Sequence, residues 1–215
     1  MKHLVLNTLI ILMLNIAFAQ RPAVDKIETS KGPLNILPLD HATMALTWQG
    51  KTVYTDPNGG AKTFDGVAPP DLIMITDIHG DHFNPETLQA IDASKATLVV
   101  PQAVADKLSE PLKSKAVVLA NGQTKEVKDI SITAVPMYNL PESADSRHPK
   151  GRGNGYVLTF GNKKVYISGD TQGIPEMRAL TDIDIAFVPM VLPYTMDEVQ
   201  AASGVAAFKP GVVYP

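Results

Sequence analysis

The chain has 215 residues and no cysteine. That length suits one domain with a sizeable core, and 45% hydrophobic with 19% charged residues is ordinary for a soluble globular protein. The formal net charge of −3 gives no basic surface of the kind that binds nucleic acid, so nucleic acid is not an expected partner. Without cysteine, disulfides are excluded and a metal must be held by histidine and carboxylate side chains.

The N-terminus predicts a signal peptide over residues 1–19. Lys2 and His3 precede an apolar run that ends at Ala17-Phe18-Ala19, which has the small-x-small pattern of a signal-peptidase site. We expect cleavage after Ala19 and a location in the bacterial periplasm or outside the cell. The alternative is an uncleaved membrane anchor, but the apolar run is short for a span and two asparagines interrupt it. No stable membrane insertion is therefore expected after cleavage.

The remaining chain predicts an N-terminal arm over residues 20–33 and one domain over residues 34–215. The predicted strands are 35–39, 42–48, 52–55, 71–76, 97–100, 116–119, 124–127, 130–136, 156–160, 164–168, 183–189 and 212–214. The predicted helices are 85–94, 101–108, 175–180 and 197–209. Hairpins and strand–helix units are mixed throughout, which favours an α+β protein with helices covering sheets.

Four potential metal ligands lie within six consecutive residues directly after a buried strand: Asp77, His79, Asp81 and His82. Imidazole nitrogens and carboxylate oxygens both suit zinc, manganese and iron. The alternative is a polar strand-to-helix loop in which Asp81 or Asn84 caps a helix that starts near residue 85. Capping explains one residue and neither histidine, so the spacing predicts a metal site.

Further candidates lie at other strand ends and in loops, where sheet proteins place their chemistry. Asp170 directly follows the strand 164–168, and His148 lies in the long loop before the hairpin. Asp170 has the alternative of an Asx-turn or helix cap, and His41 that of a surface histidine. Asp56 either supports a ligand or, as is more usual before proline, forms a turn.

Basic side chains surround His148 in the sequence: Arg147, Lys150 and Arg152. They either attract an anionic substrate or are simply solvated charges on a polar loop. Tyr194 either lines the cleft or packs in the core. The glycine-rich stretch 151–155 does not follow a strand and open a helix, so it is not interpreted as a phosphate loop.

The motif at residues 77–82, the lone His148 and the turn Ser168-Gly169-Asp170-Thr171 resemble the metallo-β-lactamase superfamily of metal-dependent hydrolases. The chain is most similar to the branch of L-ascorbate-6-phosphate lactonase-like proteins, over most of residues 34–215. The resemblance implies a four-layer αββα sandwich with metals at one edge. It also implies that Asp77, His79 and His148 hold a first metal, that Asp81 and His82 hold a second, and that Asp170 bridges them. His41 would face the metal cleft.

Two departures from the family pattern modify this expectation. Asp77 stands where the family usually has a histidine, which favours harder metals such as manganese or iron, or makes Asp77 a residue that orients a liganding imidazole. The sequence stops about where the family's last histidine would follow. We therefore expect either a C-terminally truncated domain or a second metal that is weak or absent.

The resulting prediction is a metal-dependent hydrolase in which a metal-activated water attacks an ester, lactone or phosphoester. Asp81 or Asp170 would hold the water and accept its proton. One or two divalent ions are expected, with zinc first and manganese or iron as alternatives. The substrate would be a small molecule, and it would be anionic if the basic side chains near His148 contact it. Its expected contacts are His41, Arg147, Arg152 and Tyr194. The competing hypotheses are a non-catalytic periplasmic metal- or ligand-binding protein on a hydrolase scaffold, and a fragment.

Overall fold

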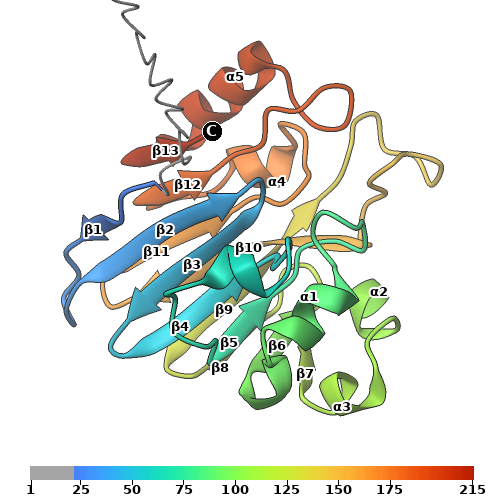
Figure 1. The fold of residues 1–215 in the computed structure, drawn as a ribbon. Coiled ribbons are helices and arrows are strands. Elements are labelled where there is room, and N and C mark those ends of the chain that lie inside the picture. The colour runs from blue at the N-terminus through green and yellow to red at the C-terminus, as the bar shows by residue number, and fades with distance from the viewer. Residues whose placement is uncertain (1–21) are drawn as a thin grey trace, which may run out of the picture.

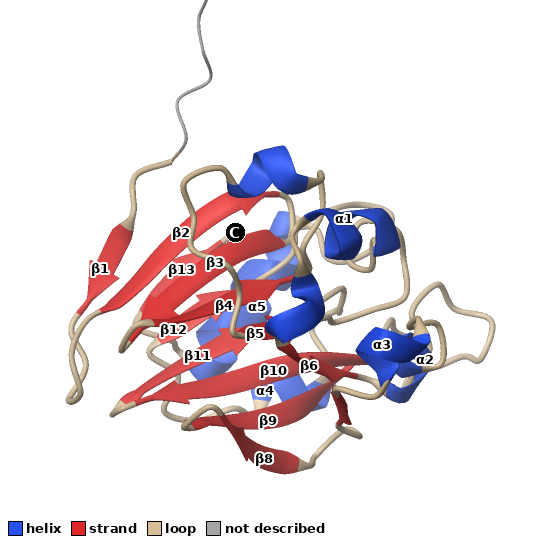
Figure 2. Cartoon of the chain, turned by 60° about the horizontal axis from the view of Figure 1, so that its bottom comes forward, coloured by secondary structure: helices blue, strands red, loops and turns tan. Residues whose placement is uncertain are grey.

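The computed structural model describes residues 22–215, in which two β-sheets lie face to face (Figures 1 and 2). The first sheet has the spatial order β1 (Asp25–Ile27), β2 (Leu34–Asp40), β3 (Thr43–Trp48), β4 (Lys51–Thr55), β5 (Leu72–Met74), β6 (Thr97–Val100) and β7 (Ala116–Val118). The second has the order β13 (Val212–Tyr214), β12 (Ile185–Phe187), β11 (Lys163–Ile167), β10 (Gly153–Phe160), β9 (Ile130–Met137) and β8 (Thr124–Val127).

Each sheet is antiparallel in one part and parallel in the other. Strands β1 to β4 pair antiparallel and β4 to β7 parallel, while β8 to β11 pair antiparallel and β11 to β13 parallel. The helices are α1 (Pro85–Ala90), α2 (Gln102–Ala105), α3 (Glu110–Lys113), α4 (Pro175–Arg178) and α5 (Glu198–Phe208), with 3-10 turns at Ala61–Phe64 and Ala93–Lys95. In Figure 1, α1 to α3 lie on the side of the first sheet, and α4 and α5 on the side of the second.

Three separate apolar clusters hold these layers together. The cluster between the sheets includes Leu46 and Leu158. A second packs α1 and α2 against the first sheet and includes Leu88, and a third packs α4 and α5 against the second sheet and includes Met177 and Phe208. Each sheet thus buries both faces, which explains why several strands are apolar without alternation. The order helix, sheet, sheet, helix confirms the predicted four-layer fold of the metallo-β-lactamase type.

Most predicted elements are present, and the differences concern short ones. The helix predicted over residues 85–94 ends at Ala90, because Asp92 has a left-handed backbone with φ of 50° and a 3-10 turn follows. The helix predicted over 101–108 is regular only over α2. Strand β1 pairs with β2 within the segment predicted as an N-terminal arm, and its sequence shows no apolar alternation. Asp197 caps α5 by accepting a hydrogen bond from the Gln200 amide, as the sequence pattern predicts.

Gly155 lies where β10 crosses close to the end of β11. A Cβ added there would lie 2.8 Å from the Ser168 carbonyl oxygen and 3.0 Å from that of Ile167, and both are backbone atoms. We expect Gly155→Ala to lower the free energy of unfolding by about 1–3 kcal/mol, because the strands must separate to admit the methyl group. Denaturant unfolding measures this change. Gly80→Ala is the control, since a Cβ at Gly80 meets no atom within 4 Å, and an equal loss in both variants would contradict the explanation.

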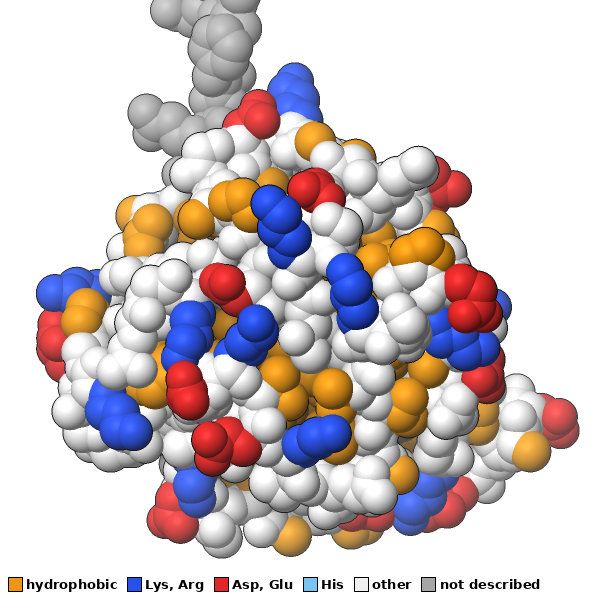
Figure 3. Space-filling view, turned by 90° about the horizontal axis from the view of Figure 1, so that it is seen from below, with side chains coloured by type: hydrophobic (Ala, Val, Ile, Leu, Met, Phe, Trp, Pro, Cys, Tyr) orange, Lys and Arg blue, Asp and Glu red, His pale blue; other side chains and the backbone are white. Residues whose placement is uncertain are grey.

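The face shown in Figure 3 gives no sign of one dominant charge. On the face shown in Figure 3, lysine and arginine side chains alternate with aspartate and glutamate. Within residues 22–215, no helix is both long and apolar enough to cross a membrane. The predicted signal peptide and its cleavage after Ala19 lie outside the described residues.

Candidate metal centre

The ends of parallel strands bring the predicted ligands together from both sheets. Strands β4 and β5 are parallel neighbours, so Asp56 after β4 and the 76–82 loop after β5 emerge at the same edge. Asp170 follows β11 of the second sheet. The Asn154 amide donates a hydrogen bond of 2.9 Å to the Thr76 carbonyl oxygen, which joins β10 to the loop. The two sheets therefore meet at the site.

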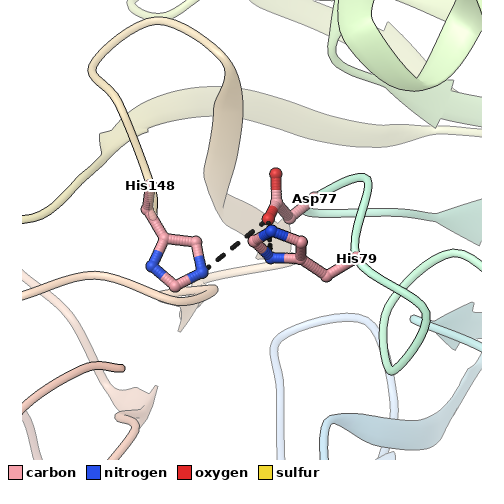
Figure 4. Close-up of side chains that lie close together, drawn as sticks. All are labelled: Asp77, His79 and His148. Atoms are coloured by element: carbon pink, nitrogen blue, oxygen red, sulfur yellow. Dashed lines mark ion pairs between the residues drawn. The ribbon is translucent and has the colours of Figure 1, made fainter. Parts of the chain in front are cut away.

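The first cluster consists of Asp77, His79 and His148, whose ligand atoms lie within 4.8 Å of one another. These side chains converge in Figure 4. Asp77 Oδ2 lies 2.7 Å from His79 Nδ1 and 3.8 Å from His148 Nε2, and the Asp77 side chain is fully buried. Asn139 Oδ1 lies 3.0 Å from His148 Nδ1 and accepts a hydrogen bond from the His148 amide, so it fixes the ring with Nε2 toward the cluster.

The second cluster consists of Asp81, His82 and Asp170, also within 4.8 Å. His82 Nε2 lies 3.3 Å from Asp170 Oδ1 and 3.7 Å from Asp81 Oδ2. The other oxygen of Asp170, Oδ2, lies 3.2 Å from His148 Nε2 of the first cluster. Asp170 thus lies between the two clusters, where the family resemblance places a bridging carboxylate.

A divalent metal fits this arrangement. Among residues 22–215, three buried ring nitrogens face the clusters and make no well-aligned hydrogen bond, although carboxylate oxygens lie 2.7–3.3 Å away: His79 Nδ1, His82 Nε2 and His148 Nε2. Buried polar atoms are normally satisfied, so three neighbouring exceptions require an explanation. A cation that accepts their lone pairs together with carboxylate oxygens supplies one, and a His and Asp donor set suits a divalent ion.

Asp56 supports His82 from the side away from the cluster. The carboxylate is buried and lies 2.8 Å from His82 Nδ1, and it also accepts hydrogen bonds from the amide and hydroxyl of Thr76. Asp56 also has a positive φ of 43°, so it combines the turn and the supporting role that the sequence left as alternatives. The sequence offered Asp56 only as one of two alternatives, and nothing in it singled out Thr76 as a support for His82. The signal for Asp56 was its position directly after β4, at the edge where the site lies.

The carboxylates and His82 perturb one another's protonation. Burial raises the pKa of Asp56, against the opposing influence of His82 and Thr76. Burial alone would lower the pKa of His82, but Asp56, helped by Asp170, raises it well above its usual value. Burial alone would raise the pKa of Asp170, but the imidazoles of His148 and His82 hold it well below its usual range. The raised pKa favours the protonated form of His82 in the absence of metal, so a metal that used Nε2 would compete with a proton.

The other expected site residues lie around the clusters. His41 Nε2 lies 3.3 Å from Asp81 Oδ2, on a turn where His41 has a positive φ of 46°. Arg147 stacks on the ring of Tyr194, with its guanidinium carbon 4.4 Å from the ring centre. Arg152 forms an ion pair with Asp77. Lys150 is held by Glu142 and Glu176.

A cavity of about 430 Å³ opens beside the second cluster. Its polar end is formed by His41, His82 and Asp170. Its walls are mostly apolar and include Met44 and Phe187. Such a cavity can bind a small molecule with a nonpolar part while exposing a polar group to the metal ligands. Arg147, Arg152 and Tyr194 lie outside its lining.

The fold and the paired clusters define a metal-dependent hydrolase of the metallo-β-lactamase type. The family model of the beta-lactamase superfamily domain matches residues 35–215. The chain belongs to this superfamily and, within it, to the UPF0173 family of metal-dependent hydrolases. A UPF0173 member from Thermoplasma acidophilum is 32% identical over 196 residues, which are 85% of this chain and 82% of the relative.

Further comparisons agree with this assignment. A UPF0173 member from Pyrococcus abyssi is 30% identical over 149 residues, so the match spans 67% of this chain and 65% of that relative's length. A crystal structure assigned to the metal-dependent hydrolases, from Parabacteroides distasonis, has a TM-score of 0.81 and 38% identity, covering 90% of this chain and 86% of that one. A diiron beta-hydroxylase from Streptomyces venezuelae shares the fold with a TM-score of 0.67 and 22% identity, covering 83% of this chain and 44% of that one.

Proposed function

We propose that this chain hydrolyses an ester, lactone or phosphoester bond of a small molecule with a metal-activated water. The observation that carries the proposal is the convergence of three buried imidazole nitrogens, which lack well-aligned hydrogen bonds, with the carboxylates of Asp77, Asp81 and Asp170. A bound divalent ion lowers the pKa of a coordinated water toward neutrality and stabilises a developing oxyanion. Zinc is the ion we expect from these ligands, and manganese or iron are the alternatives that the carboxylate at position 77 favours.

The catalytic roles go to the two carboxylates of the second cluster. Asp170 lies against both His82 and His148, so its oxygens can hold a water between the clusters. Asp81 is partly exposed, and its Oδ2 lies close to His41. We assign Asp81 or Asp170 as the acceptor of the water's proton, and His41 as a group that contacts the substrate next to Asp81.

The substrate that suits this site combines a nonpolar part with an anionic group. Met44 and Phe187 offer apolar contact inside the cavity. The expected contact Arg152 is held by Asp77, so Arg147, stacked on Tyr194, is the cation we assign to an anionic substrate group. A lactone that carries a phosphate has these features and is the substrate class of the branch that the sequence motif resembles.

We also propose that the protein works in the periplasm or outside the cell after cleavage following Ala19. The apolar run and small-x-small pattern near the N-terminus support this location. An N-terminal sequence that begins at Gln20 in protein from the native host would agree with it, and an intact Met1 would not.

The hydrolase proposal is tested with three probes, one for each bond class: 4-nitrophenyl acetate, γ-butyrolactone and bis(4-nitrophenyl) phosphate. The full chain is stripped with a chelator and assayed before and after zinc or manganese is restored. We expect metal-dependent turnover of at least one probe. Binding of metal without turnover of any probe or of phosphorylated lactones would contradict the proposal and favour a non-catalytic metal-binding protein.

A further inference from the structure

Asp77 has a partner that distinguishes it from the carboxylates of the second cluster. Arg152 donates from Nε to Asp77 Oδ1 at 3.2 Å and from Nη2 to Oδ2 at 3.0 Å. Two parallel N–H bonds to one carboxylate make a rigid, charge-neutral pair. The Asp77 side chain is fully buried and the Arg152 side chain is 21% exposed, so solvent weakens the pair only in part.

The Arg152 guanidinium also lies next to the ligand atoms of the first cluster. Arg152 Nη2 is 3.4 Å from His79 Nε2, and it binds the Asp77 oxygen that faces His79 Nδ1 and His148 Nε2. A divalent ion held by these atoms would therefore lie within a few ångströms of a permanent positive charge. Repulsion between the two cations is strong at such a distance in a buried site.

The backbone keeps Arg152 in this place. The next residue, Gly153, packs so closely on the loop that an added Cβ would lie 2.9 Å from the Thr76 carbonyl oxygen. That oxygen also accepts the hydrogen bond from the Asn154 amide. Because β10 is attached at this point to the loop that carries Asp77, the arginine is held against the carboxylate.

Among residues 22–215, no arginine or lysine pairs with the carboxylates of the second cluster. The ion pairs of Asp81 and Asp170 are with histidines, namely His41, His82 and His148. A further buried carboxylate, Asp56, lies behind His82. These negative charges attract a divalent ion, whereas Arg152 cancels the charge of Asp77 in the first cluster.

We propose that the two clusters bind metal unequally, and that Arg152 is the positioning residue that makes them so. The second cluster, Asp81, His82 and Asp170, binds a divalent ion first, which reverses the expectation from the sequence that the metal at Asp81 and His82 is the weak one. The Asp77–Arg152 pair weakens the first cluster by at least about tenfold and supplies there the positive charge that a second ion would otherwise supply. This inference rests on the proposed metal-dependent function, and its test does not depend on turnover.

The test is a metal count on the full chain and on Arg152→Gln, with Lys150→Gln as a control that removes a positive charge from the same loop without touching a ligand. Each protein is loaded with zinc, passed through a desalting column and measured by elemental analysis, and zinc binding is followed by calorimetry. We expect the unmodified chain and Lys150→Gln to retain about one equivalent, and Arg152→Gln to retain about two, because Asp77 loses its competing partner.

Asp77→Asn keeps the test decisive if Arg152→Gln does not fold, since asparagine preserves the shape and can still accept from the guanidinium. We expect this variant to retain the one tight equivalent. Two equivalents of equal affinity in the unmodified chain, or loss of the tight ion in Asp77→Asn, would overturn the inference while leaving the hydrolase proposal in place. No bound zinc or manganese in any variant would overturn both.

Discussion

Replacing Asp170 by asparagine is expected to remove the tightly bound metal and to lower kcat/KM for the best probe by about 10³-fold. Among residues 22–215, Asp170 is the one carboxylate with ion pairs to imidazoles of both clusters, through Oδ1 to His82 and Oδ2 to His148. Asparagine keeps the shape but loses the charge and one acceptor oxygen, so the cation loses its central anionic ligand. Elemental analysis and initial-rate kinetics on the same preparation measure the two losses.

Asp145→Asn is the matched control for this variant. Asp145 lies exposed in the same long loop as His148, and its side chain is not part of either cluster. The control should keep its metal and its turnover. An Asp170→Asn protein with normal metal content and normal kcat/KM would show that this carboxylate is not a ligand, whatever its position between the rings.

Replacing Asp56 by asparagine is expected to lower the metal affinity of the second cluster by about 10–100-fold, although Asp56 touches no metal. Asp56 holds His82 Nδ1 at 2.8 Å and thereby directs Nε2 toward the cluster. The amide of asparagine presents a donor where Thr76 and His82 need an acceptor, so the ring loses its support. Calorimetric titration with zinc measures the change.

The zinc affinity of the second cluster should also depend on pH, and differently in the unmodified chain and in Asp56→Asn. Asp56 raises the pKa of His82, so in the unmodified chain metal displaces a proton and the affinity rises with pH until His82 deprotonates by itself. In Asp56→Asn that pKa falls, the pH dependence flattens, and the difference between the two proteins grows with rising pH. Asp71→Asn is the control, because Asp71 binds the Thr52 amide at the start of the same strand region, away from the clusters. Equal pH profiles for all three proteins would contradict the role of Asp56.

The metallo-β-lactamase scaffold also carries a diiron beta-hydroxylase in Streptomyces venezuelae, so the scaffold does not determine the reaction. We propose that in this chain the ion pair between Asp77 and Arg152 and the support of His82 by Asp56 shape the metal chemistry.

The sequence by itself determined the class of fold and most of the candidate ligands. The apolar runs with turn residues between them located most strands, because burial on both faces requires apolar side chains wherever the strands run. The cluster of Asp77, His79, Asp81 and His82 could be recognised because all four residues belong to one short loop. Short elements such as β1 and α3 escaped detection, because neighbouring elements stabilise them more than their own residues do.

Only the tertiary structure showed which side chains of the site pair with one another. The partners Asp77 and Arg152 are 75 residues apart in sequence, and Asp56 and His82 are 26 apart, so no local pattern relates them. Arg152 was expected at the substrate, and the structure pairs it with the candidate ligand Asp77. Asp56, in a turn before proline, lies against the His82 imidazole. Periodicity and spacing report burial and local geometry, whereas these pairs exist only because two sheets bring the ends of different strands to one edge.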